Sequence, residues 1–186
     1  NSLIPLSKSA YPFILLDNFL SEPMVLVRDN NDEIKCFSNV CTHRGNIVIS
    51  DPGKYKTLTC GYHGRKFDLN GKFKSMPEFQ KTKDFPRACD HLHEFKIEKL
   101  GPFLFAGVNP EFKLSDTFKI MKERIGFLPI NQFKLDTNKS KDYLVNSNWA
   151  LYCDNFLEGF HIPFVHDDLN DVLDYGDYKT LTYDKM

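Results

Sequence analysis

The chain has 186 residues, of which 41% are hydrophobic, and 24 Lys and Arg nearly balance 25 Asp and Glu. This balance argues against nucleic acid or an anionic membrane surface as the main partner. No apolar run approaches the roughly 18 residues that a spanning helix needs. No signal-peptide pattern opens the chain, so we expect a soluble, cytoplasmic protein. The five cysteines are too sparse for a secreted disulfide scaffold, which favours metal binding or catalysis.

Short strands joined by turns are predicted for residues 1–110. The apolar or alternating runs that mark them lie at 13–16, 24–28, 34–40, 57–60, 66–69, 72–74, 95–100 and 102–108. Asn70-Gly71 suits a type I′ hairpin turn, because both residue types tolerate positive φ. Short strands at this spacing favour a small β-sandwich or barrel.

Helical patterns begin after Asn109-Pro110, where we place a domain boundary near residue 110. Ser115 can cap a helix over 116–124. A second helix is predicted from Trp149 to Phe160, where apolar residues recur at helical spacing after a cap such as Asn148. Residues 111–186 are therefore expected to form an α+β domain, and the whole chain an α+β protein.

Two short segments carry metal-binding residue types. They are Cys41-Thr-His43-Arg-Gly45 and Cys60-Gly-Tyr-His63-Gly64, and each supplies one thiolate and one imidazole. Two Cys and two His also suit a structural zinc site, but zinc folds commonly pair Cys with Cys and His with His. A cluster with two thiolates on one iron and two imidazoles on the other needs mixed pairs, because each loop must reach both irons. The spacing therefore predicts a [2Fe–2S] cluster.

Other cysteines and histidines are interpreted as structural. Cys89-Asp-His91-Leu-His93 repeats the Cys-x-His pattern without a second half, so we expect ordinary surface or strand residues there. Cys36 and Cys153 lie in apolar runs and are predicted to be small core side chains.

A second group of candidate ligands follows Trp149. Glu158 and His161 are three residues apart, which places them on one face of a helix. His166 is five residues beyond His161, and on a regular helix the two would diverge by roughly 140°. Pro163 must kink or end the helix, which can bring His166 back towards His161. The alternative is that both histidines are satisfied polar groups on a buried helix.

The segments CTHRG and CGYHG resemble the cluster-binding motifs of Rieske proteins, and NWALYCDNFLEGFHIPFVH resembles the iron-binding helix of Rieske non-haem iron oxygenase α subunits, above all those related to choline monooxygenase. The resemblance implies an all-β Rieske domain, followed by the beginning of a helix-grip-like catalytic domain. In the cluster, Cys41 and Cys60 would hold one iron while His43 and His63 hold the other. His161 and His166 would bind mononuclear Fe(II), with a carboxylate completing a facial triad.

The resemblance also assigns a role to Glu158. The family usually has Asp at this position, and that acid connects the iron site to a cluster histidine of the neighbouring subunit in a homotrimer. The family's third iron ligand lies well past residue 186. The local candidates do not match its position, so we expect the chain to be truncated; these are Asp167, Asp168, Asp171 and Asp174.

By this resemblance the chain is the oxygenase component of a multicomponent monooxygenase or dioxygenase. Electrons from NAD(P)H would arrive through a flavin/iron–sulfur reductase or a ferredoxin, and O₂ would hydroxylate a small substrate such as a quaternary amine or an aromatic acid. A Rieske-type ferredoxin, acting only as an electron carrier, is the alternative, but it would end near residue 110. A respiratory bc-type subunit needs disulfide cysteines where Asn46 and Arg65 stand.

Overall fold

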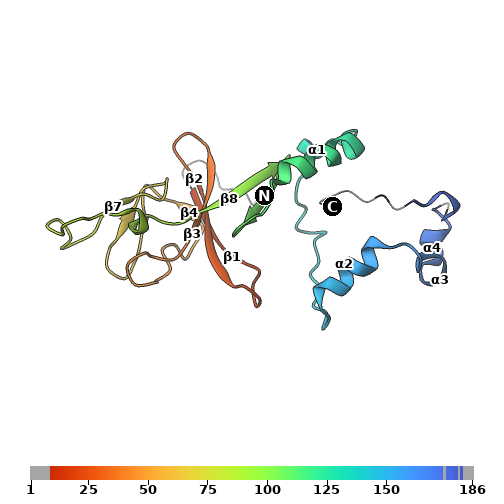
Figure 1. The fold of residues 1–186 in the computed structure, drawn as a ribbon, viewed down its shortest axis with the longest axis horizontal. Helices are drawn as coiled ribbons and strands as arrows, with labels where there is room; N and C mark the ends of the chain where they lie inside the picture. The colour runs from red at the N-terminus through yellow and green to blue at the C-terminus, as the bar shows by residue number, and fades with distance from the viewer. Residues whose placement is uncertain (1–8, 174, 180, 182–186) are drawn as a thin grey trace. The chain divides into compact units, whose positions relative to one another are not determined.

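The chain divides into two compact units, Asn1–Leu135 and Asp136–Met186. The computed structural model describes residues 9–173, 175–179 and 181 (Figure 1). We predicted a boundary near residue 110, where the sequence pattern changes from strand to helix. The contacts between residues instead divide the chain after Leu135. The helix α1 (Leu114–Ile125) contacts strand β8 (Glu94–Leu100), so it belongs with the strands that precede it.

A six-stranded antiparallel sheet forms the centre of the first unit, with strand order β4-β1-β2-β3-β8-β9. Its strands are β1 (Ser9–Leu15), β2 (Glu22–Arg28), β3 (Ile34–Ser38), β4 (Gly53–Lys54), β8 and β9 (Phe103–Gly107). Successive side chains of a strand point to opposite faces. On β2, Val25 and Val27 accordingly join one core cluster, while Met24 and Leu26 join another. The central strand is therefore buried on both faces.

A smaller three-stranded sheet carries the second cysteine segment. It contains β5 (Leu58–Thr59), β6 (Lys66–Phe67) and β7 (Phe73–Ser75) in that order. Leu58 and Phe67 are fully buried in the same core cluster as Cys41 and Cys60. The predicted all-β first domain is confirmed. Strand β4 was not predicted, because Gly53 and Lys54 lie in a polar stretch of the sequence that contains no apolar run.

The hairpin turn before β7 is not the predicted type I′ turn. In its described residues only Gly71 has a positive φ, of 72°, whereas type I′ requires two such residues. The Asp68 carboxylate accepts the N–H groups of Asn70 and Lys72, which stabilises a different turn. Gly71 is needed for a second reason, since a Cβ there would lie 2.7 Å from the ring of Phe37.

The N-terminus of helix α1 is capped by a side chain of strand β8. The Glu98 carboxylate of β8 accepts the N–H groups of Leu114 and Ser115, so Glu98 replaces the predicted Ser115 cap. A carboxylate is well suited to this end of a helix, where the unpaired N–H groups lie. Phe118 of α1 is buried, and its ring lies 5.1 Å from that of Phe105.

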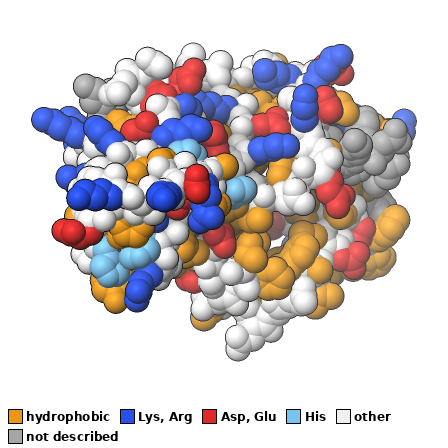
Figure 2. Space-filling model, turned by 60° about the vertical axis from the view of Figure 1, so that its left-hand side comes forward, with side chains coloured by type: hydrophobic (Ala, Val, Ile, Leu, Met, Phe, Trp, Pro, Cys, Tyr) orange, Lys and Arg blue, Asp and Glu red, His pale blue; other side chains and the backbone are white. Residues whose placement is uncertain are grey.

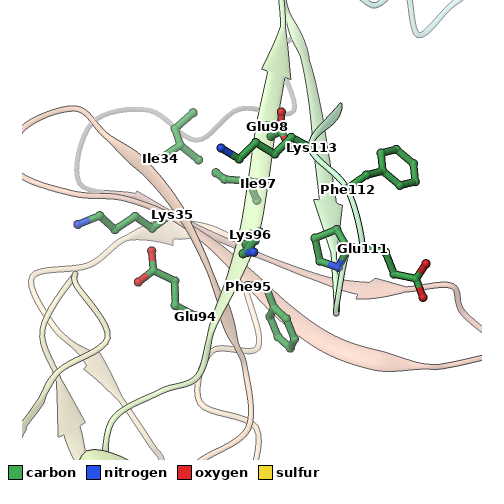
Figure 3. A pocket seen from close by; sticks show the side chains of 11 residues that line it. Ile34, Lys35, Glu94, Phe95, Lys96, Ile97, Glu98, Glu111, Phe112 and Lys113 are labelled. Atoms are coloured by element: carbon green, nitrogen blue, oxygen red, sulfur yellow. The ribbon is translucent and has the colours of Figure 1, made fainter. Parts of the chain in front are cut away.

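An open pocket of about 710 Å³ lies beside this cap (Figure 3). Strands β3 and β8 pair only at Cys36–Phe95 and Phe37–Glu94, and the pocket opens where they diverge. Charged side chains of both signs line it, including Lys35. None of the predicted metal ligands is among the lining residues.

The described residues of the second unit form helices and no strand. These are α2 (Trp149–Leu157), α3 (Ile162–Val165), α4 (Asp167–Asn170) and a 3₁₀ turn at Tyr175–Asp177. Asn148 caps α2 by accepting the N–H of Ala150 at 2.9 Å. No residue of α2 is buried, so the prediction of Cys153 as a core side chain is wrong. In the part of the chain that the structure describes, no helix is long and apolar enough to cross a bilayer.

Candidate metal centres

The first cysteine segment forms a tight turn between β3 and β4. The N–H of Cys41 donates to the carbonyl of Asn46 at 2.7 Å, and the N–H of Gly45 donates back to the carbonyl of Cys41 at 2.9 Å. Gly45 has a φ of 72°, and a Cβ there would meet nothing within 4 Å. Glycine is therefore favoured at this position by the backbone conformation and not by lack of space.

The second segment repeats this turn between β5 and β6. The N–H of Cys60 donates to the carbonyl of Arg65 at 2.8 Å, and the N–H of Gly64 donates to the carbonyl of Cys60 at 3.1 Å. Gly64 has a φ of 69°. The two segments thus share one hydrogen-bond pattern, which presents a cysteine and a histidine from each turn in a similar way.

The four predicted cluster ligands come together as two pairs. The thiols of Cys41 and Cys60 lie close enough for each to change the pKa of the other, and both residues are buried. The rings of His43 and His63 lie edge to face with their centroids 4.7 Å apart, and both residues are half-buried. Figure 2, in which the side of Figure 1 that carries β7 is turned forward, shows histidine side chains at the surface among hydrophobic and basic ones.

Burial and local hydrogen bonds set the protonation of these groups. Burial raises the pKa of the Cys41 thiol. Burial also acts on Cys60, but the N–H of Tyr62 and the Cys41 thiol together bring the Cys60 pKa below its usual value. Burial lowers the pKa of His43, and the nearby Arg44 and Arg65 guanidinium groups lower it further, which favours the neutral imidazole that can bind metal. The site is therefore suited to a thiolate and a neutral imidazole.

The donor set fits a [2Fe–2S] cluster. Nδ1 of His43 is buried and has no hydrogen-bond partner among the described residues, so it is available as a ligand. Within the same described ranges, no group of three or more His, Cys, Asp or Glu side chains could hold a single metal ion. A structural zinc ion needs four ligands around one centre. Separate thiol and imidazole pairs instead match a centre with two irons.

Side chains other than the four ligands hold the turns in place. The Asn46 amide donates to Sγ of Cys60 at 3.7 Å, and so joins the first turn to the second. The Thr42 hydroxyl donates to the carbonyl of Asp90 at 2.9 Å. Sequence reasoning missed both contacts, because Cys60 and Asp90 are distant in sequence from Asn46 and Thr42. The only available signal was the position of Asn46 and Thr42 beside the ligands.

The Cys-x-His repeat near β8 is structural, as predicted. Cys89 is exposed. Nδ1 of His91 accepts the N–H of Phe73 at 2.9 Å, and the ring of His93 lies 4.8 Å from that of Phe95. These histidines therefore contribute to the packing of the first unit.

The second histidine pair lies in the helical unit, and its rings have centroids 5.2 Å apart for His161 and His166. The prediction that Glu158 and His161 share a helix face is wrong. Helix α2 ends at Leu157, and Glu158 is extended, with φ −118° and ψ 157°. Gly159 follows, and a Cβ there would lie 2.6 Å from the ring of Tyr178.

Pro163 does not kink the helix, contrary to prediction. It lies in the first turn of α3, where a proline needs no N–H partner. His161 immediately precedes this short helix and His166 immediately follows it. The two histidines come together because the chain breaks before and after α3, at Glu158 and at His166, where φ is −126° and ψ is 70°.

Glu158 holds the His161 ring. One carboxylate oxygen contacts Nδ1 of His161 and the other accepts the N–H of Phe160. The hydrogen bond from His161 is the main reason that the pKa of Glu158 is below its usual value. Because Nδ1 is engaged, Nε2 of His161 is the nitrogen left for a metal.

No third ligand completes this pair among the described residues. The nearby acids Asp167, Asp168 and Asp171 are exposed, and Asp174 lies outside the described residues. Two imidazoles fit part of an iron site, which normally adds a carboxylate.

Comparison with known families separates the same two regions. Residues 16–86 match the Rieske [2Fe–2S] domain, and residues 130–184 match the ring hydroxylating alpha subunit (catalytic domain). Both predicted cluster segments lie inside the first match, and His161 and His166 lie inside the second. The two domain matches indicate a [2Fe–2S] cluster and a mononuclear iron.

Relatives extend the likeness along most of the chain. Choline monooxygenase of Arabidopsis thaliana is 27% identical over 173 residues, and that of Amaranthus tricolor is 30% identical. A carnitine monooxygenase oxygenase subunit from Acinetobacter baumannii is 26% identical over 168 residues. The alignments cover 87–88% of this chain but only 38–45% of these relatives. The chain therefore spans less than half the length of these curated relatives.

Solved structures show the same fold. The quaternary ammonium Rieske monooxygenase CntA with L-carnitine has a TM-score of 0.72 at 21% identity, covering 97% of this chain and 51% of that one. Naphthalene 1,2-dioxygenase with indole has a TM-score of 0.62 at 22% identity, covering 92% of this chain and 39% of the other.

These matches define a chain with a Rieske [2Fe–2S] domain followed by a helical segment of a ring-hydroxylating α-subunit domain. More particularly, it is homologous to the choline and carnitine monooxygenases of the Rieske oxygenase family.

Proposed function

We propose that this chain belongs to the oxygenase component of a Rieske non-haem iron monooxygenase that acts on a small quaternary ammonium compound. The observation that carries the proposal is the presence of two metal-binding arrangements in one chain. One is the paired thiols and imidazoles, and the other is His161 and His166 with Glu158. A ferredoxin would not need the second arrangement.

The assigned ligands are Cys41 and Cys60 for one iron of the cluster and His43 and His63 for the other. Bound there, the cluster supplies one-electron transfer. Burial of Cys41 and Cys60 keeps water from the thiolates, and the half-buried imidazoles of His43 and His63 leave the cluster site accessible to an electron donor. We assign a flavin/iron–sulfur reductase or a ferredoxin as that donor, and a homotrimer as the assembly.

His161 and His166 are assigned to mononuclear iron, which supplies O₂ activation when bound. Glu158 orients the His161 ring through Nδ1 and favours the tautomer that offers Nε2. The quaternary ammonium substrate is inferred from the relatives, which are named choline and carnitine monooxygenases. We assign no substrate pocket among the described residues.

Metal and sulfide analysis of the purified chain tests the cluster. We expect two irons and two labile sulfides per chain and, after reduction, an EPR signal with the low average g of a histidine-ligated cluster. Mononuclear Fe(II) should bind only weakly to this chain, because two imidazoles lack the third ligand. Stoichiometric zinc without sulfide, from cells grown in iron-replete medium, would contradict the assignment.

Glu158→Gln should slow electron transfer in the oxygenase that contains this chain. Gln keeps the size of the side chain but loses the charge that holds Nδ1 of His161. We expect reoxidation of the reduced cluster by O₂ and choline or carnitine to slow by about 10–100-fold, with cluster content unchanged. The measurement is stopped-flow absorbance in a single turnover.

Asp154→Asn is the matched control, because Asp154 is an exposed acid on α2 close in sequence to Glu158. It should react at the wild-type rate. If Glu158→Gln loses mononuclear iron in proportion to its rate, the carboxylate acts only on His161. In that case the predicted connection to a neighbouring subunit is wrong.

A further inference from the structure

Arg65 is the largest fully buried side chain of the described residues, at 2% exposure, although it carries a permanent charge. It follows the second ligand turn by one residue and closes that turn through its own carbonyl, which accepts the N–H of Cys60. Its guanidinium lies 5.0 to 5.8 Å from the ring centroids of Phe67, Phe73 and Phe85. Cation–π contacts of this kind stabilise a guanidinium that has been removed from water.

Asp90 is the charged partner of Arg65. Nη2 of Arg65 donates to Oδ1 of Asp90 at 2.7 Å and to the Asp90 carbonyl at 3.2 Å. The same carbonyl accepts the hydroxyl of Thr42, which stands between Cys41 and His43. The ion pair is therefore bonded to both ligand turns, to one through the Arg65 backbone and to the other through Thr42.

We propose that Arg65 is a positioning residue for the cluster, one that joins the two ligand turns and raises the reduction potential by placing a buried positive charge beside them, with Asp90 acting in the opposite direction. This inference rests on the proposed cluster. It explains why a strongly basic side chain is buried two residues after His63, although Arg65 is not itself a metal ligand.

The sign follows from charge. One-electron reduction adds one negative charge to the cluster site, and a nearby positive charge stabilises that state while a negative charge destabilises it. Because the ion pair is buried, water and salt screen these interactions little. A role confined to packing predicts no such opposition of sign between the two residues.

The test is the midpoint potential of the cluster in the purified 186-residue chain, measured by a redox titration followed by EPR. Arg65→Gln should shift the potential to more negative values, by about tenfold in the one-electron equilibrium constant, or ~59 mV. Asp90→Asn should shift it to more positive values. Arg65→Lys, which keeps the charge but not the planar group, should stay closer to wild type than Arg65→Gln.

Arg87→Gln is the matched control. The Arg87 side chain is 70% exposed, and Nε lies 3.8 Å from Oδ2 of Asp90, so a similar charge is removed where water screens it. Its potential should remain close to that of wild type.

The outcomes separate the two proposals. A wild-type chain without iron and sulfide contradicts the proposed cluster itself. The role of Arg65 is overturned if loaded Arg65→Gln and Asp90→Asn both keep the wild-type potential, or if both shift it in the same direction. If Arg65→Gln fails to fold, Asp90→Asn still decides the sign, because it removes the opposite charge of the same ion pair.

Discussion

Cys41→Ser is expected to abolish cluster binding. Cys41 and Cys60 are the two assigned thiolate ligands, and both are free cysteines. A serine hydroxyl is a poor substitute for a thiolate on iron–sulfur clusters. The remaining ligands would leave one iron with a single thiolate. Iron and labile sulfide should fall to background, and the visible absorption of the protein should disappear.

The matched control is Cys89→Ser, which changes the exposed cysteine of the second Cys-x-His sequence. It should keep wild-type iron, sulfide and absorption. A Cys41→Ser protein that retains its full cluster would contradict the ligand assignment. Equal losses in both variants would show that the substitutions act through folding, which circular dichroism detects independently.

Phe67→Ala should lower the free energy of unfolding by about 3–5 kcal/mol. Phe67 is fully buried in β6, in the core cluster that contains both predicted thiolate ligands. Truncation removes a large apolar side chain and leaves a cavity beneath the ligand turns. The measurement is denaturant unfolding of the chain, followed by the absorption of the cluster.

Phe19→Ala provides the comparison, since Phe19 is 81% exposed and lies in the β1–β2 turn. Its free energy of unfolding should stay within about 0.5 kcal/mol of wild type. A similarly small effect at Phe67 would mean that the core around β6 adapts to the loss. The packing argument for the ligand turns would then be wrong.

The local patterns that the sequence carries were sufficient for most of the first unit. The strands are short, but turn residues separate them, and the two Cys–His segments stand at fixed spacings beside glycines. Such signals need no knowledge of distant contacts. They were enough to predict the fold class and to identify the residues that form the thiol and imidazole pairs.

Features that depend on distant segments could not be predicted in this way. Glu98 caps α1 from another strand, and Asp90 meets Arg65 from 25 positions away in sequence. The end of α2 is a similar case, because the contact of Gly159 with Tyr178 is invisible to helical periodicity. Proline at 163 suggested the wrong breaking point because its position within α3 was unknown.

The closeness of the two buried thiols has a practical consequence for handling the protein. Once the metal has been lost, Cys41 and Cys60 are near neighbours in the same fold, and oxidation can join them as a disulfide with the release of two electrons and two protons. Their burial hinders reducing agents as well as oxidants. Air and iron therefore compete for the same two sulfur atoms, and reconstitution should begin with a reductant and without oxygen.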